Sequence, residues 1–243
     1  MIGVVVAMPP EAFAVFGRKG WLPLKTNLSI FSYQQVSATC LVVQSGLGLA
    51  RAEEAAQWLL SQGVKALVSL GISGGLIEDL ATGDLLLADT FTGREREFKA
   101  DVAGVARCSA ALERTALNWR CGKLVSVEQA VLSPAAKLNL AEKSGALAVD
   151  MESAAVALVA EMANLPYFAL RSVCDTVSQE VGLDPARILT KEGQVKVGRL
   201  VTEIVQRPSL LLVLPGLGKD FNVALAALKQ GWHVLEGEFE RSR

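Results

Sequence analysis

Histidine is nearly absent from this chain, since His233 is the single histidine among 243 residues. Zinc sites of the H-E-x-x-H type need two histidines on one helix and are therefore excluded. The same scarcity argues against a Ser-His-Asp or Cys-His nucleophilic site. Any acid–base chemistry is expected to depend on carboxylates.

Cysteines and long apolar runs are also scarce. The four cysteines lack C-x-x-C spacing, so we expect reduced and mostly buried thiols, not disulfides or metal ligands; they are Cys40, Cys108, Cys121 and Cys174. No apolar run reaches about 18 residues, and the N-terminus MIGVVVAMPPE lacks the basic flank of a signal peptide. We therefore expect no membrane span and a cytoplasmic location. A net charge of −1 offers no footprint for nucleic acid.

What the chain does contain is typical of an α/β protein: 51% hydrophobic residues, with strand-like and helix-like stretches in alternation. No repeat or low-complexity linker divides it. We expect one domain over residues 1–243, with a helical extension from about 190 to 243. The expected strands are Ile2–Ala7, Ser29–Gln35, Thr39–Gln44, Ala66–Leu70, Leu85–Ala88, Lys123–Ser126, a short one ending at Asp150, and Tyr167–Cys174. One expected helix begins at Pro10, and another begins just after Asp150 with acids in its first turn. The other expected helices cover Leu49–Ser61, Ala110–Trp119, Pro134–Lys143, Glu192–Gln206 and Phe221–Gln230.

The stretch from Ala146 to Asp175 organises the chain, because it reads as one strand–helix–strand unit. Asp150, Glu152 and Asp175 fall at or just after the carboxyl ends of its strands. Ligands of open α/β sheets bind at that edge. Asp150 is interpreted as the N-cap of the helix. Three carboxylates at one edge predict a polar ligand site.

Two glycine-rich segments follow strands, SGLG at 45–48 and GISGG at 71–75. Such glycines indicate positive φ angles or close backbone approach, and each segment fits either a plain turn or a ligand loop. Glu11 lies in the first turn of a helix, where an acid is favourable in any case. Residues 93–104 are expected to form a charged, solvated connection, and Thr176 to Leu183 a loop that could cover the site.

Six motifs in order resemble the nucleoside phosphorylase/nucleosidase family: AMPPE at 7–11, SGLG at 45–48, GISGGL at 71–76, TGDLLLAD at 82–89, AVDMESAAVA at 148–157 and LRSVCD at 170–175. The similarity is greatest to methylthioadenosine/S-adenosylhomocysteine nucleosidases and the related hopanoid-associated nucleosidases. This resemblance implies a single three-layer α/β/α domain with a mixed central sheet. It also implies a homodimer or higher homo-oligomer and a small-molecule nucleoside substrate, with no metal or cofactor.

The resemblance assigns roles to four residues. Glu152 matches the acid that holds the ribose 2′- and 3′-hydroxyls, and Met151 matches the apolar residue beneath the sugar. Asp175 matches the acid that protonates purine N7, and Glu11 the acid that orients the attacking water. The glycine segments contribute expected substrate-binding residues: Ser45, Gly46, Gly71, Ser73 and Gly74.

The implied chemistry sets the protonation states. A leaving purine must be neutral, so Asp175 should be protonated near pH 7, with a pKa raised by burial and a neighbouring hydrogen bond. Glu11 should stay ionised to polarise water. Cys174 stands where the family often has serine, which would weaken the bond that orients Asp175.

Hydrolysis and phosphorolysis both remain open, although Val68 to Gly71 lacks the arginine with which phosphorylases hold phosphate, and hydrolysis is favoured. Arg51 could reach an anion or be a solvated helix cation. The segment Ser126 to Val131 lacks the aromatic residue expected against the base. The apolar run Pro208 to Leu217 is interpreted either as core packing or as the wall of a pocket for a lipid-linked adenosine. A protein that binds nucleosides without turnover is the alternative outside enzymes.

Overall fold

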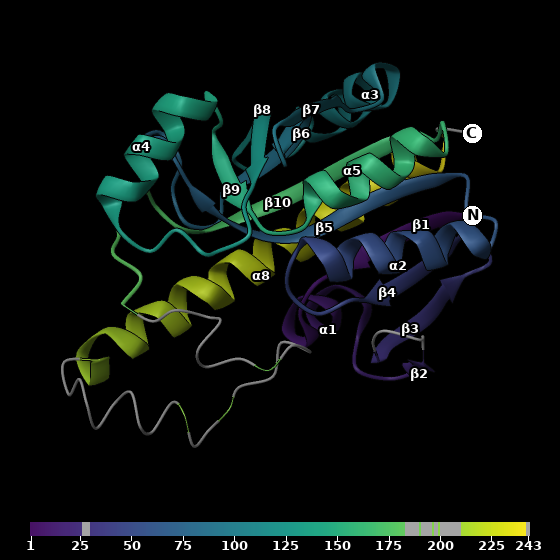
Figure 1. Ribbon diagram of the computed structural model, residues 1–243, viewed down its shortest axis with the longest axis horizontal. Helices are drawn as coiled ribbons and strands as arrows, with labels where there is room; N and C mark the ends of the chain where they lie inside the picture. Colours follow the sequence, from purple (N-terminus) through teal and green to yellow (C-terminus); the bar gives the residue numbers. More distant parts are fainter. Residues whose placement is uncertain (26–29, 183–189, 191–195, 197–198, 200–209, 242–243) are drawn as a thin grey trace.

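The computed structural model describes residues 1–25, 30–182 and 210–241, together with 190, 196 and 199. A mixed ten-stranded sheet forms the centre of the molecule and carries six helices among the described residues (Figure 1). This confirms the expected α/β fold. None of the described helices is long and apolar enough to cross a membrane.

The buried valine-rich strand β1 (Ile2–Val6) lies between two parallel neighbours, β4 (Cys40–Gln44) and β5 (Ala66–Gly75). Burial on both faces explains its continuous apolar sequence. Beyond β4 the sheet continues through antiparallel partners, β3 (Ile30–Ser37) and β2 (Leu22–Lys25). The sequence predicted β3 and β4 but missed β2.

Strand β5 is the hub of the sheet because it also pairs with β10 (Tyr167–Asp175) in parallel and with β9 (Ala148–Asp150) in antiparallel orientation. From β10 the pairing continues through β6 (Leu85–Gly93) and β8 (Trp119–Ser126) back to β9. These five strands therefore close into a ring. The carboxyl ends of β9 and β10 meet the last residues of β5 there.

Helices cover both faces of the sheet. Helices α2 (Leu49–Ser61) and α5 (Ser153–Met162) pack together on one face, in front of the sheet in Figure 1. On the other face α8 (Leu210–Glu240) contacts β10 and β5, and α1 (Pro9–Phe16) and α3 (Val102–Leu112) pack against it. Helix α4 (Pro134–Ser144) lies beyond β9 and matches its expected position.

Residues 93–119 differ from the expected arrangement. A tight turn at Arg94 and Glu95 joins β6 to β7 (Arg96–Lys99), and both residues adopt positive φ angles of 50° and 60° without glycine. Asp101 then caps α3 by accepting a hydrogen bond from Gly104 N at 2.6 Å. The expected solvated connection and the helix at 110–119 were therefore wrong: the helix starts earlier, and a strand begins at Trp119.

The glycine segment 71–75 is not a loop but the end of β5, and none of its glycines has a positive φ angle. The C-terminal region also differs. Helix α8 runs without a break through Pro215, so the expected separate start at Phe221 was wrong. Its buried Trp232 and Phe239 belong to the core and are not an appendage. The expected helix Glu192–Gln206 falls almost entirely outside the described residues.

Candidate active site at the end of strand β5

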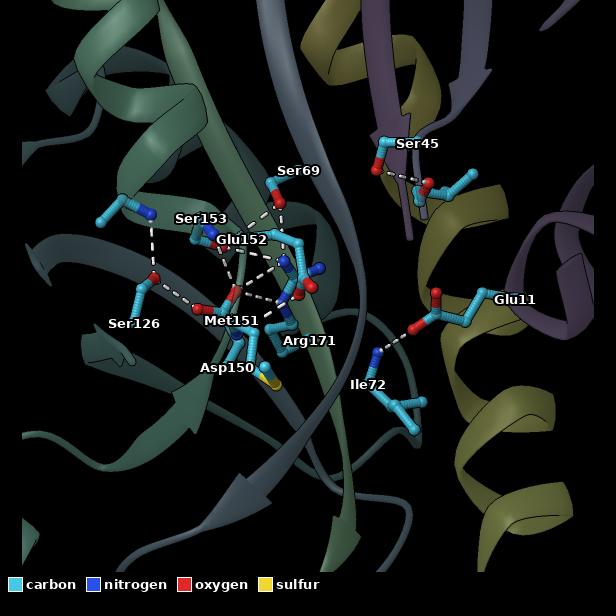
Figure 2. A network of polar contacts seen from close by, with 12 residues as sticks. Glu11, Ser45, Ser69, Ile72, Ser126, Asp150, Met151, Glu152, Ser153 and Arg171 are labelled. Atoms are coloured by element: carbon cyan, nitrogen blue, oxygen red, sulfur yellow. Dashed lines mark hydrogen bonds and ion pairs between the residues drawn. The ribbon is translucent and has the colours of Figure 1, made fainter. Parts of the chain in front are cut away.

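Glu11 projects from the first turn of α1 toward β5 and is 2% exposed. Its Oε1 accepts a hydrogen bond from Ile72 N at 2.9 Å (Figure 2), and its Oε2 accepts one from Met8 N at 2.8 Å. Burial raises the pKa of Glu11 above its ordinary value, while these N–H donors and the Arg171 charge act in the opposite direction. A carboxylate with a raised pKa is a stronger base, which suits proton abstraction from water.

Glu152 is the N-cap residue of α5 and is also buried. Its Oε1 accepts a hydrogen bond from Gly48 N at 2.9 Å, across 104 positions of sequence, and Met151 N lies 3.3 Å from Oε2. Burial, followed by the negative charge of Asp150, raises the pKa of Glu152 to about 8. The SGLG segment therefore has a tertiary role, since Gly48 adopts a φ of 99° and presents its N–H to this carboxylate.

Arg171 is the central residue that the sequence reasoning passed over. Its Nε and Nη2 both donate to Asp150 Oδ2, at 2.9 and 2.6 Å, and the guanidinium is almost fully buried. Nη2 also donates to the hydroxyls of Ser69 and Ser153. The arginine in LRSVCD, inside an apolar strand, was the signal, because a buried cation requires a partner.

Asp150 is not the N-cap that the sequence predicted, because it ends β9 and Glu152 occupies the N-cap position of α5. It does accept a hydrogen bond from Ser153 N at 3.0 Å, at the start of α5. Its other oxygen accepts the Ser126 hydroxyl, which in turn accepts a hydrogen bond from Ala154 N (Figure 2). Asp150 therefore fixes β8, β10 and α5 together around Arg171.

The third guanidinium nitrogen, Arg171 Nη1, is buried and makes no hydrogen bond among the described residues. It lies beside Glu11 above Gly71: a Cβ placed on Gly71 would be 2.6 Å from Glu11 Oε1 and 2.9 Å from Nη1. Only glycine fits at this position. A carboxylate oxygen and an unpartnered N–H donor thus converge on one point.

Asp175 ends β10, close to Gly74 of β5, where an added Cβ would lie 3.2 Å from Asp175 Oδ2. Burial raises the pKa of Asp175, as expected, but its hydrogen-bonding neighbour opposes that shift. The neighbour is Lys137 of α4, whose ammonium pairs with Oδ2. No hydrogen bond joins Cys174 to Asp175 among the described residues. The sequence pattern of α4 gave no reason to select Lys137.

The remaining expected site residues differ in their surroundings. Ser73 is buried, and its hydroxyl makes no hydrogen bond in the described part of the chain. The Ser45 hydroxyl bonds the Gly46 carbonyl at 2.8 Å, and Gly46 N donates to Ala7 O at 2.9 Å. Ser45 and Gly46 therefore hold the SGLG segment against the end of β1, and Ser45 lies on the Glu11 side of the site, away from Asp150 and Arg171 (Figure 2).

An open hollow of about 430 Å³ adjoins Gly48, the residue that contacts Glu152. Its lining residues are Leu47, Gly48, Leu49, Ala50, Arg51, Arg94 and Glu128. Arg51 also donates to Ser45 O at 3.2 Å, so part of its guanidinium supports the loop. In the described residues no group of three or more His, Cys, Asp or Glu side chains is arranged to hold a metal ion.

An α/β fold with buried carboxylates at the end of its hub strand defines a protein equipped for acid–base chemistry on a bound small molecule. More particularly, the chain belongs to the phosphorylase superfamily, whose family model matches residues 1–206.

Individual relatives agree with that family. A 5′-methylthioadenosine/S-adenosylhomocysteine nucleosidase of Baumannia cicadellinicola is 26% identical over 85% of this chain and 99% of its own length. An aminodeoxyfutalosine nucleosidase of Helicobacter pylori is 27% identical over 55% of this chain and 65% of its own length. A solved Helicobacter pylori methylthioadenosine/S-adenosylhomocysteine nucleosidase superposes with a TM-score of 0.74 at 18% identity, covering 98% of this chain and 97% of its own.

Proposed function

We propose that this protein is a nucleosidase that hydrolyses the N-glycosidic bond of a 5′-substituted adenosine and releases the purine base. The observation that carries the proposal is the convergence of Glu11 Oε1 and Arg171 Nη1 above Gly71. A water molecule between these atoms would donate to the carboxylate and accept from the guanidinium. Similar proteins named as nucleosidases support the same reaction.

Glu11 and Asp175 divide the acid–base work. Glu11 removes a proton from the attacking water, for which its raised pKa makes it an effective base. Asp175 protonates N7 of the purine, so that the base departs as a neutral molecule. Burial favours the protonated form of Asp175 and therefore supports this role.

Glu152 holds the sugar between these two groups. In its ionised form its carboxylate accepts hydrogen bonds from the two ribose hydroxyls, and the positive charge that develops at C1′ favours that form over the protonated one. Met151, next to it, forms the apolar surface beneath the ring. Gly48 N donates a hydrogen bond to one Glu152 oxygen and so holds it in place.

Phosphorolysis is the second candidate reaction, and the charge arrangement disfavours it. A phosphate dianion needs cations that are not already neutralised, but Arg171 is paired with Asp150 and lies beside Glu11. A second carboxylate against the nucleophile position repels an anion and tolerates water. Water is therefore the better nucleophile here.

The 5′ substituent is the finer part of the proposal. The names methylthioadenosine and adenosylhomocysteine share adenosine and differ in the group attached to it, and another relative is named for aminodeoxyfutalosine. A lipid-linked adenosine of the adenosylhopane type is a further candidate, motivated by the apolar run Pro208 to Leu217. Residues 208 and 209 of that run lie outside the described part of the chain.

The test is an assay of released base with adenosine, methylthioadenosine, adenosylhomocysteine, inosine and a lipid-linked adenosine, each with and without phosphate. We expect free sugar and no phosphate requirement. Formation of a sugar 1-phosphate would establish a phosphorylase. Adenine binding without turnover of any substrate would establish a non-enzymatic nucleoside-binding protein. The Glu11→Gln variant should lose hydrolysis and retain nucleoside binding.

A further inference from the structure

Helix α4 buries a lysine and exposes the leucine next to it, the reverse of what is usual for these residue types. Lys137 is fully buried, whereas its neighbour Leu138 is 54% exposed. Placing an amino group in the interior is costly unless it is paired, so the inverted burial requires a specific partner. The partners of Lys137 lie at the end of β10 and in the turn that follows it.

Lys137 Nζ has three acceptors, as many as an ammonium group has N–H donors. They are Asp175 Oδ2, the Thr176 carbonyl at 2.6 Å and the Gln179 carbonyl at 3.1 Å. The turn that follows β10 is thereby fixed on α4. It is also tied to α8, because Gln179 Nε2 donates to Asp220 Oδ2 at 2.9 Å.

The two oxygens of Asp175 are consequently not equivalent. Oδ2 faces an ammonium donor, while Oδ1 makes no hydrogen bond among the described residues. An oxygen that accepts from an ammonium group cannot also carry the acid proton in that direction. The proton of a neutral Asp175 is therefore placed on Oδ1.

We propose that Lys137 is a positioning residue for the general acid: it binds Oδ2 of Asp175, directs the acid proton to Oδ1, and stabilises the carboxylate left after proton transfer. The inference deepens the proposed nucleosidase function and rests on it. No motif of the family resemblance contains Lys137.

In the step itself, the Asp175 Oδ1–H bond breaks as the N7–H bond forms, and the electron pair of the C1′–N9 bond passes into the purine. Asp175 is left as a carboxylate paired with Lys137. A lone pair of the attacking water forms the new C1′–O bond, and Glu11 takes one proton from that water. Exchange with solvent returns one proton to Asp175 and removes one from Glu11.

Other charges around Asp175 set the background for a pH measurement. Asp220 of α8 adds negative charge and raises the pKa of Asp175, and burial does so more strongly; Lys137 lowers it. The adjacent Cys174 thiol has a pKa raised to about 12 and stays neutral near pH 7. The positive charge of Lys137 thus opposes the effect of burial on the pKa of Asp175.

The test compares Lys137→Met with Lys143→Met, which makes the same change at an exposed position of the same helix. Activity depends on protonated Asp175, so it falls as pH rises through the Asp175 pKa. Removing the cation raises that pKa. We expect the alkaline limb of kcat/KM for methylthioadenosine, or for the best substrate of the panel, to move up by roughly 1–3 pH units. We also expect kcat to fall by roughly 10- to 100-fold, less than the full contribution of a general acid.

A second background separates positioning from a merely structural role. In the Asp175→Asn protein, adding Lys137→Met should lower kcat little further, because the group through which Lys137 acts is gone. Lys137→Gln keeps N–H donors without the charge, and it replaces Lys137→Met should that variant fail to fold. A loss of activity with an unmoved alkaline limb, or wild-type kinetics, would overturn the inference. Wild-type protein that cleaves no nucleoside would instead overturn the proposed function.

Discussion

Arg171 of β10 donates two hydrogen bonds to a single oxygen of Asp150 at the end of β9, and both side chains are almost fully buried, with 2% and 1% exposed. This pair joins the two strands on either side of the hub strand β5. The charge of Arg171 acts on both Glu11 and Glu152, and lowers the pKa of each. The pair therefore holds the site together and balances part of its negative charge.

Breaking this pair should cost much more stability than breaking a surface pair. Asp150→Asn deprives the buried Arg171 of its hydrogen-bonded ion-pair partner, and we expect the free energy of unfolding to fall by about 3–5 kcal/mol. The matched control is Glu161→Gln, which breaks the half-exposed pair with Arg96 and should cost less than about 1 kcal/mol. Urea unfolding of the two variants measures the difference. Equal losses in the free energy of unfolding would show that the buried pair contributes no more to stability than the surface pair.

A methyl group at Gly71 should abolish the arrangement of the nucleophile site. The added Cβ would meet Glu11 and Arg171 inside van der Waals distance, so one of them must move. We expect Gly71→Ala to lower kcat/KM at least about 100-fold, since displacements near 1 Å at reacting groups have effects of that size. Gly216→Ala serves as control because nothing lies within 4 Å of its added Cβ. Comparable activity of both variants would contradict the assigned position of the water.

The raised pKa of Glu152, about 8, predicts a pH dependence of stability. Between the ordinary value of 4.5 and about 8, the folded state holds a proton that the unfolded state has lost. Stability contributed by this group is therefore complete below pH 4.5 and is lost as pH rises toward 8. Glu152→Gln should remove a slope of up to about 1.4 kcal/mol per pH unit.

Denaturant unfolding of ligand-free protein at pH 5, 6, 7 and 8 measures that slope. The exposed Glu142→Gln, on helix α4, provides the control and should retain the wild-type slope. A Glu152→Gln protein with an unchanged slope would show that Glu152 ionises normally in the fold.

Replacement of the general acid should affect catalysis more than affinity. Asp175→Asn cannot supply a proton, and we expect kcat to fall by about 10²–10⁴, the usual contribution of one general acid. The exposed Asp79→Asn should behave like wild type. Because Lys137 loses its counter-charge in Asp175→Asn, thermal unfolding should be recorded alongside the kinetics to keep the assay below the transition. Near-wild-type turnover would remove Asp175 from the mechanism.

The sequence by itself determined the α/β class, most of the strands, and the family resemblance through its short motifs. These features are local: apolar runs, proline and glycine positions, and acids next to strand ends, all of which follow from the chemistry of a few adjacent residues. The turn at Arg94 and Glu95 was not predicted, because neither residue type indicates a positive φ angle.

Only the tertiary structure decided how the charges pair. Arg171 reads as an interruption of a strand and Lys137 as an ordinary helix cation until β9, β10 and α4 are brought together. The glycines of 71–75 likewise read as a loop, although they are a strand that two side chains approach closely. Pairing and close approach depend on residues far apart in sequence, so the free energy that fixes them is realised only once the chain is folded.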